Sequence, residues 1–115
     1  MSRELGLKGE EIALNFLIEK GYELVERNFT ARSGEIDLIL MDKDTMVFVE
    51  VKYYGKNNFA DIHLSLTSSK KMKLRKTINV YLSEIDQEIP ARLDVVLISN
   101  ENEQNKIEHF QGIEI

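Results

Sequence analysis

The chain has 115 residues, of which 43% are hydrophobic and 30% charged, and it contains no cysteine. These values are typical of one globular domain over residues 1–115 and argue against a disordered chain. The lack of cysteine excludes disulfides and thiolate metal sites and favours a cytoplasmic location. We expect neither export nor a membrane span, because there is no signal-peptide pattern and no long apolar run. The formal net charge of −5 means that a nucleic-acid site would need a local cluster of basic residues.

The first half of the chain predicts one helix and three strands. Apolar residues recur at helical spacing over residues 2–20, and Gly21 suits the end of a helix. A strand is expected over 22–29, after a short connection. Two apolar runs, 35–41 and 45–54, are separated by only three residues, so they predict a β-hairpin.

The second half predicts one helix and two strands. Thr67 or Ser68 can cap a helix that runs to about residue 84 and has one apolar face. Strands are expected over 91–99 and 106–115, the last of them at a sheet edge. The predicted order is α-β-β-β-α-β-β, which defines an α/β protein with a mixed sheet flanked by helices.

The predicted hairpin carries four charged residues within apolar runs: Glu35, Asp37, Glu50 and Lys52. Side chains alternate between the faces of a strand, so the parity of the hairpin loop decides whether these four share one face. An odd loop would separate them. We expect an even loop, and a loop over 42–45 would set Asp37 opposite Glu50.

Three carboxylates on one face of an apolar hairpin repel one another, and their removal from water costs free energy. A divalent cation would compensate, since Mg²⁺ binds one or two carboxylates together with waters and phosphate oxygens. Lys52 could then hold a phosphate or orient an attacking water. The alternative is a solvated face on which Asp37 pairs with Lys52.

The first helix supplies another candidate carboxylate. Glu10 borders its apolar stripe, whereas Glu11 is turned toward solvent. Gly6 and Gly9 lie on the same side and would permit close approach of the sheet or of a ligand. Alternatively, Glu10 is only a boundary residue at the start of the helix.

Three segments together resemble the YraN-like family of bacterial proteins: "GLKGEEIALNFLIEKGYELVERNF", "GEIDLI" and "VFVEVK". This family is similar to archaeal Holliday-junction resolvases and is placed in the restriction-endonuclease-like, PD-(D/E)XK class. The resemblance covers nearly the whole chain. It implies a Mg²⁺ site, also open to Mn²⁺, on the central hairpin of a mixed sheet.

Carried over by position, the resemblance implies catalytic roles for Glu10, Asp37, Glu50 and Lys52. The metal ligands would be Glu10, Asp37, Glu50 and the main-chain carbonyl of Val51, with Glu35 as an outer group. Ile36 stands where the class motif has proline, and Tyr53-Tyr54 stands where relatives often carry a basic residue.

The densest basic run is "KKMKLRK" on the second predicted helix. We expect a nucleic-acid surface made of Lys70, Lys71, Lys73, Lys76, Arg32 and Lys56. Phe59, in the loop before this helix, could stack on a base. The alternative is that these charges form an ordinary solvated face.

His63 and His109 lack partners at metal-ligand spacing and are expected to be surface or packing residues. Asp94 has a counterpart in the family that the chain resembles, but a structural pairing with Arg92 or with a loop explains it as well.

The leading hypothesis is a Mg²⁺-dependent endonuclease that hydrolyses DNA phosphodiester bonds, at branched or repair intermediates. It needs no small-molecule cofactor, and the resemblance is compatible with a homodimer. Two alternatives remain open: a nucleic-acid-binding module that does not cut, and a protein-interaction adaptor, which the net negative charge favours.

Overall fold

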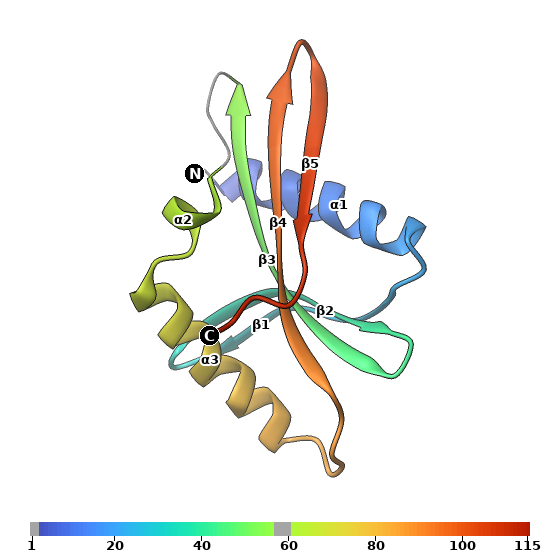
Figure 1. Cartoon of the computed structure of the whole chain (residues 1–115), viewed down its shortest axis with the longest axis vertical. Helices are drawn as coiled ribbons and strands as arrows, with labels where there is room; N and C mark the ends of the chain where they lie inside the picture. The colour runs from blue at the N-terminus through green and yellow to red at the C-terminus, as the bar shows by residue number, and fades with distance from the viewer. Residues whose placement is uncertain (1–2, 57–60) are drawn as a thin grey trace.

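The computed structural model describes residues 3–56 and 61–115 and contains a five-stranded sheet flanked by helices (Figure 1). In chain order the elements are α1 (Arg3–Glu19), β1 (Glu23–Ala31), β2 (Gly34–Asp42), β3 (Thr45–Lys56), α2 (Ile62–Ser65), α3 (Ser68–Ser83), β4 (Ala91–Glu101) and β5 (Gln104–Phe110). The predicted order is confirmed, with the short helix α2 added in the connection before α3. Thr67 is the residue that caps α3.

The strands lie in the order β1-β2-β3-β4-β5. β3 and β4 are parallel, because the chain crosses between them through α2 and α3, and all other neighbours are antiparallel. The sheet is therefore mixed, and β5 is an edge strand, as predicted.

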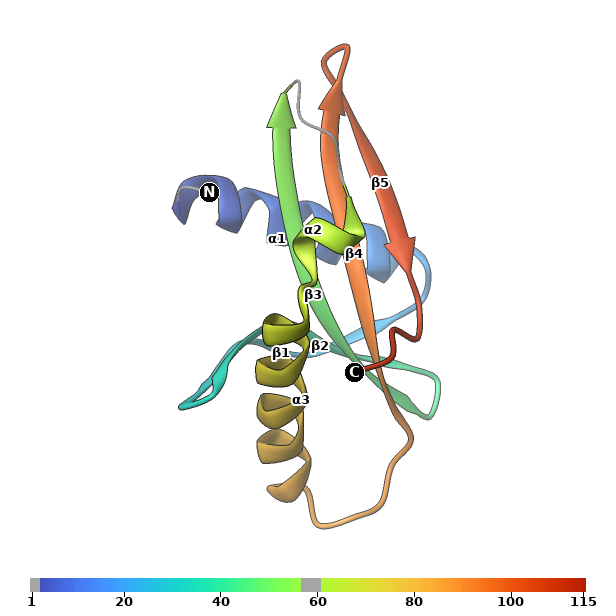
Figure 2. The same cartoon turned by 60° about the vertical axis from the view of Figure 1, so that its left-hand side comes forward.

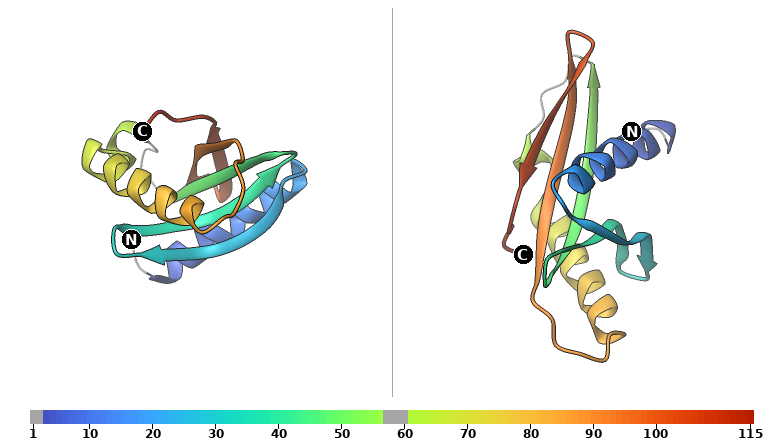
Figure 3. Two further views of the ribbon diagram at one scale, coloured as in Figure 1. Left: turned by 90° about the horizontal axis from the view of Figure 1, so that it is seen from below. Right: turned by 90° about the vertical axis from the view of Figure 1, so that its right-hand side faces the viewer.

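The two long helices cover opposite faces of the sheet (Figure 3). Leu17 of α1 packs in a core with Val49 and Val51, whereas Leu74 of α3 packs in a second core with Phe48. Alternate residues of β3 thus point toward α1 and toward α3. No helix in the described part of the chain is both long and apolar enough to cross a bilayer.

The β2–β3 hairpin has the even loop that the charge pattern requires. Asp42 pairs with Thr45 across a two-residue turn, and the register continues to Leu38 opposite Val49. One further step in this register brings Asp37 opposite Glu50. The regular pairing of β2 with β3 ends just before that step.

Strict alternation along β2 fails at Asp37. Leu38 belongs to the core under α1, but Ile36 belongs with Ile39 to the core under α3. Regular alternation along the strand predicts that Ile36 shares a face with Leu38, and this prediction is wrong because the strand turns over at Asp37. Asn28, which faces Asp37 across β1 and β2, has a left-handed backbone with a φ of 52°.

This turn carries the end of the β1–β2 hairpin away from the sheet and against α3 (Figure 2). The hydroxyls of Ser33 and Thr77 lie 2.7 Å apart, and the rings of Phe29 and Tyr81 meet edge-on with centroids 5.0 Å apart. The β1–β2 hairpin thus packs on the middle and end of α3, beside the place where β2 leaves β3.

Candidate functional site

Asp37 and Glu50 lie together where β2 leaves β3. A carboxylate oxygen of Asp37 accepts a hydrogen bond of 2.8 Å from the backbone N–H of Val51, which would otherwise face a strand partner. The Glu50 carboxyl group lies close enough to perturb that of Asp37, and Glu50 is only 7% exposed. Because the N–H and C=O of one strand residue point the same way, the Val51 carbonyl faces this opening as well.

The Asp37 carboxyl group is strongly perturbed by its surroundings. Burial raises its pKa to about 8, and the negative charge and hydrogen bond of Glu50 add to that increase. The hydrogen bond from Val51 acts in the opposite direction but is outweighed. Without a cation, the Asp37 carboxyl group is therefore protonated at neutral pH.

Two further carboxylates approach Asp37 from the other side. The side-chain amide of Asn28 donates to Glu10 Oε1 at 2.8 Å and to Glu35 Oε1 at 3.3 Å. Burial raises the pKa of Glu10, the Asn28 hydrogen bond opposes this, and the charges of Asp37 and Glu35 raise it further. An open cavity of about 440 Å³ lies here, lined by Gly6, Leu7, Glu10, Asn28 and Glu35.

Helix α1 has the orientation that its sequence predicts. Glu10 faces the sheet, whereas Glu11 is exposed and forms an ion pair of 2.9 Å with Arg27. A Cβ atom placed on Gly9 would lie 2.9 Å from the Cβ of Tyr53. Gly9 therefore permits the close packing of α1 on β3 that brings Glu10 to the site.

The expected lysine lies near the carboxylate pair, and the structure adds another. Lys52 is half-buried on the strand face of Glu50 and forms no ion pair with a described residue, so the alternative pairing with Asp37 is not found there. Lys70, from the first turn of α3, places its Nζ atom 3.5 Å from Glu50 Oε1. A small cavity of about 100 Å³ separates the hairpin end from α3, lined by Gly34, Glu35, Glu50, Lys70, Lys73 and Leu74.

The predicted basic surface is only partly described. Lys73 and Lys76 are exposed on α3 and Lys71 is half-buried, as the helical spacing predicts. Arg32 is exposed in the β1–β2 turn that packs against α3. Lys56 ends β3, but its side chain and the whole of Phe59 lie outside the described residues.

The donors at this opening fit a hard divalent cation. Asp37, Glu50 and the Val51 carbonyl supply oxygen atoms, and Mg²⁺ accepts such a partial set together with waters and substrate oxygens. Glu10 lies at the margin, held by Asn28. Among the described residues, no three acidic, histidine or cysteine side chains already surround one point. A cation would therefore complete its coordination with ligands from outside the protein.

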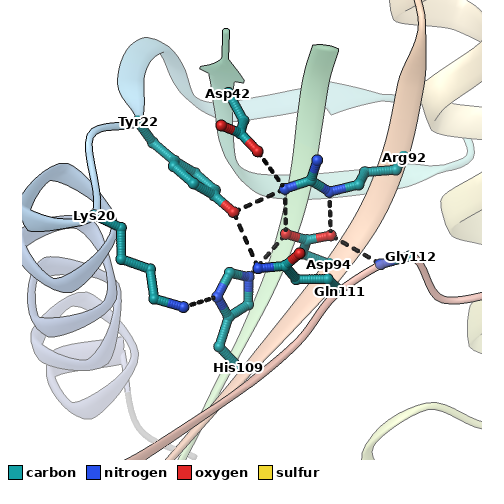
Figure 4. Close-up of polar contacts among 8 residues, drawn as sticks. All are labelled: Lys20, Tyr22, Asp42, Arg92, Asp94, His109, Gln111 and Gly112. Carbon is teal, nitrogen blue, oxygen red and sulfur yellow. Dashed lines mark hydrogen bonds and ion pairs between the residues drawn. The ribbon is translucent and has the colours of Figure 1, made fainter.

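A second polar cluster was largely missed by the sequence analysis (Figure 4). Asp94 is fully buried and accepts hydrogen bonds from Arg92, at 3.0 Å, and from the backbone of Gly112, at 3.1 Å. Its other oxygen lies 2.8 Å from Nε2 of His109, whose side chain is 3% exposed. The Arg92–Asp94 pair and the packing role of His109 are confirmed, whereas His63 is exposed.

The same cluster ties several elements together through Arg92. Its guanidinium donates to the hydroxyl of Tyr22 at 2.7 Å and to Asp42 at 3.1 Å. Lys20, after the end of α1, lies 2.8 Å from the other ring nitrogen of His109. Every buried side-chain nitrogen and oxygen in the described part of the chain has a partner, so this cluster is a structural clamp.

The fold and the site together define a class: a small mixed α/β protein in which the half-buried Asp37 meets the buried Glu50 on the central hairpin. The chain belongs to the uncharacterised protein family UPF0102, whose sequence pattern matches residues 9–98. This match spans all four predicted catalytic residues and confirms the family that the motifs resemble. The relation to nucleases stays a prediction.

Individual relatives match over nearly their whole length. A UPF0102 protein of Thermodesulfovibrio yellowstonii is 39% identical over 109 residues, which cover 95% of this chain and 94% of that protein. One of Syntrophomonas wolfei is 42% identical over 96% of each chain. One of Helicobacter pylori is 44% identical over 85% of this chain and 83% of its own.

Proposed function

We propose that this protein is an endonuclease that depends on a divalent cation and hydrolyses phosphodiester bonds in DNA. The observation that carries the proposal is the packing of the half-buried Asp37 carboxyl group against the buried Glu50 where β2 leaves β3. Lys70 lies 3.5 Å from Glu50, and Lys52 is two residues further along β3. Two carboxyl groups withdrawn from water in this way cost folding free energy, and a bound cation would offset that cost. A preference for branched or repair intermediates rests on the family resemblance.

Each residue of the pair and its neighbours has a role in this proposal. Asp37, Glu50 and the Val51 carbonyl would hold Mg²⁺ or Mn²⁺, with Glu10 at the margin. The bound cation supplies Lewis acidity toward a water nucleophile and a phosphate oxygen. Lys52 orients that water or stabilises the negative charge that develops on the phosphate.

The basic residues would hold the DNA backbone beside the cation site. Lys70 and Lys73 line the small cavity next to Glu50, and Arg32 lies in the turn packed against the same helix. Contacts of this kind with phosphates make the affinity fall as salt increases. They would supply locally the positive charge that a chain of net charge −5 lacks overall.

A nucleic-acid-binding module that does not cut is the second candidate. The contact between Lys70 and Glu50 favours it, because this ion pair neutralises part of the acidic site without a cation. A homodimer and a cytoplasmic location stay predictions under either candidate.

The test is cleavage of labelled linear, single-stranded and four-way-junction DNA with Mg²⁺ or Mn²⁺. The proposal expects cleavage that requires the cation and falls at least about 100-fold in Asp37→Asn and in Lys52→Ala. Glu11→Gln is the matched control, since it removes an exposed carboxylate one residue from Glu10 and should cut normally.

The other outcomes separate the candidates. Equal cleavage by Asp37→Asn would contradict the proposed site. Salt-dependent DNA binding without cleavage would support the binding module. A protein that neither binds nor cleaves DNA would support the protein-interaction adaptor.

A further inference from the structure

Asn28 is an uncharged residue among the carboxylates, and the sequence analysis assigned it no role. Its side-chain amide has two N–H donors, and each donates to a different carboxylate. Nδ2 donates to Oε1 of Glu10 in α1 at 2.8 Å and to Oε1 of Glu35 in β2 at 3.3 Å. A residue of β1 thus joins the helix and the hairpin beside Asp37.

The chemistry of this contact suits a site that must keep its charge. A lysine or arginine in the same place would neutralise the carboxylates and compete with a cation for them. An amide orients Glu10 without removing its negative charge. Asn28 engages only Oε1 of that carboxylate, and no described residue forms a hydrogen bond or ion pair with the other oxygen.

The backbone of Asn28 supports the same conclusion. Its φ of 52° lies in the left-handed region, which asparagine adopts more readily than most residues. Asn28 is also exposed, and a single exposed hydrogen bond contributes little to stability. Asn28 therefore orients the neighbouring carboxylates and contributes little to the packing of the core.

We propose that Asn28 is a positioning residue that holds Glu10 at the margin of the site, from which its carboxylate can reach a cation bound by Asp37 and Glu50. This inference rests on the proposed function and extends it to a residue outside the predicted ligand set. Glu35, the second acceptor, is held in the same contact.

The test is titration calorimetry of Mn²⁺ binding to the full chain without DNA. The variants are Asn28→Gly, which keeps the left-handed backbone and removes the amide, Glu10→Gln, and the two combined. Loss of a residue that orients a metal ligand typically costs about tenfold in affinity, and we expect this weakening for Asn28→Gly. The combined variant should bind no more weakly than Glu10→Gln alone, because Asn28 acts through Glu10.

Two controls keep the outcomes distinct. Glu11→Gln breaks the neighbouring contact between α1 and β1, to Arg27, and should bind Mn²⁺ like the wild type. Thermal unfolding checks that each variant is folded. The role of Asn28 would be overturned if folded Asn28→Gly bound Mn²⁺ with wild-type affinity. It would also be overturned if the losses of affinity caused by Asn28→Gly and Glu10→Gln multiplied in the combined variant. Either result would leave the metal site itself standing. No Mn²⁺ binding by the wild type would overturn the metal site of the proposed function as well.

Discussion

The carboxyl group of Asp37 binds its proton more tightly in the folded protein than in the unfolded chain. Its ordinary pKa is 3.8, and burial beside Glu50 raises it to about 8. Between these values the folded state keeps a proton that the unfolded state has lost. Without a cation, the contribution of Asp37 to stability is therefore present below about pH 4 and is lost as the pH rises toward 8.

Asp37→Asn should accordingly stabilise the cation-free protein at pH 8. The asparagine oxygen can still accept the hydrogen bond from Val51, and its amide can donate to Glu50 without carrying a charge. We expect a gain of roughly 1–3 kcal/mol in the free energy of unfolding at pH 8, and a flatter pH dependence from 5 to 8. Urea denaturation at several pH values measures both, and a less stable variant at pH 8 would refute this account of Asp37.

At the scale of the elements, the contact of α1 with β3 depends on Gly9. Alanine at this position would gain about 1 kcal/mol in helix propensity. Its Cβ would, however, lie 2.9 Å from the Cβ of Tyr53, and neither atom is the end of a flexible side chain. The helix would have to move away from the strand.

We therefore expect Gly9→Ala to lower the free energy of unfolding by about 1–3 kcal/mol, because overpacking outweighs the gain in propensity. Asn15→Ala, at an exposed position of the same helix, is the control and should be neutral or slightly stabilising. Thermal unfolding of both variants checks the comparison. A Gly9→Ala protein as stable as the control would show that α1 can shift freely.

Sequence patterns predicted the helices, the strands and the hairpin register well, but they did not predict the local geometry at Asp37. Helical spacing gave α1 and α3, and the parity of the hairpin loop placed Asp37 opposite Glu50. The reversal of β2 at Asp37 was missed, because strict alternation assumes a regular strand. An asparagine facing that position was the one available signal, since Asn28 tolerates a left-handed backbone.

At the scale of the whole molecule, the clamp around Asp94 joins segments from Lys20 to Gly112. Such a network leaves no local pattern, so only the pairing of Arg92 with Asp94, two residues apart, was predictable. Burial acts to raise the pKa of Asp94, but hydrogen bonds from His109, Arg92 and Gly112 hold it below its ordinary value. Its stabilising contribution is therefore present above about pH 4 and is lost as the pH falls through the lowered pKa.

Asp94→Asn should lower the free energy of unfolding at pH 7 by about 3–5 kcal/mol, because it leaves the Arg92 guanidinium without its buried partner. Asp42→Asn removes a more exposed partner of the same guanidinium and should cost less than about 1 kcal/mol. Urea denaturation at pH 7 compares the two, and equal losses would contradict the clamp. At pH 3 the difference between the two variants should shrink.

We propose that the pair formed by Asp37 and Glu50 holds a divalent cation. The most direct measurement is the thermal unfolding of the wild type and of Asp37→Asn at pH 8, with and without millimolar Mg²⁺. We expect Mg²⁺ to raise the melting temperature of the wild type. Without Mg²⁺, Asp37→Asn should melt at a higher temperature than the wild type, and Mg²⁺ should not change its melting temperature. A wild type that does not respond to Mg²⁺, or an equal response in the variant, would contradict this proposal.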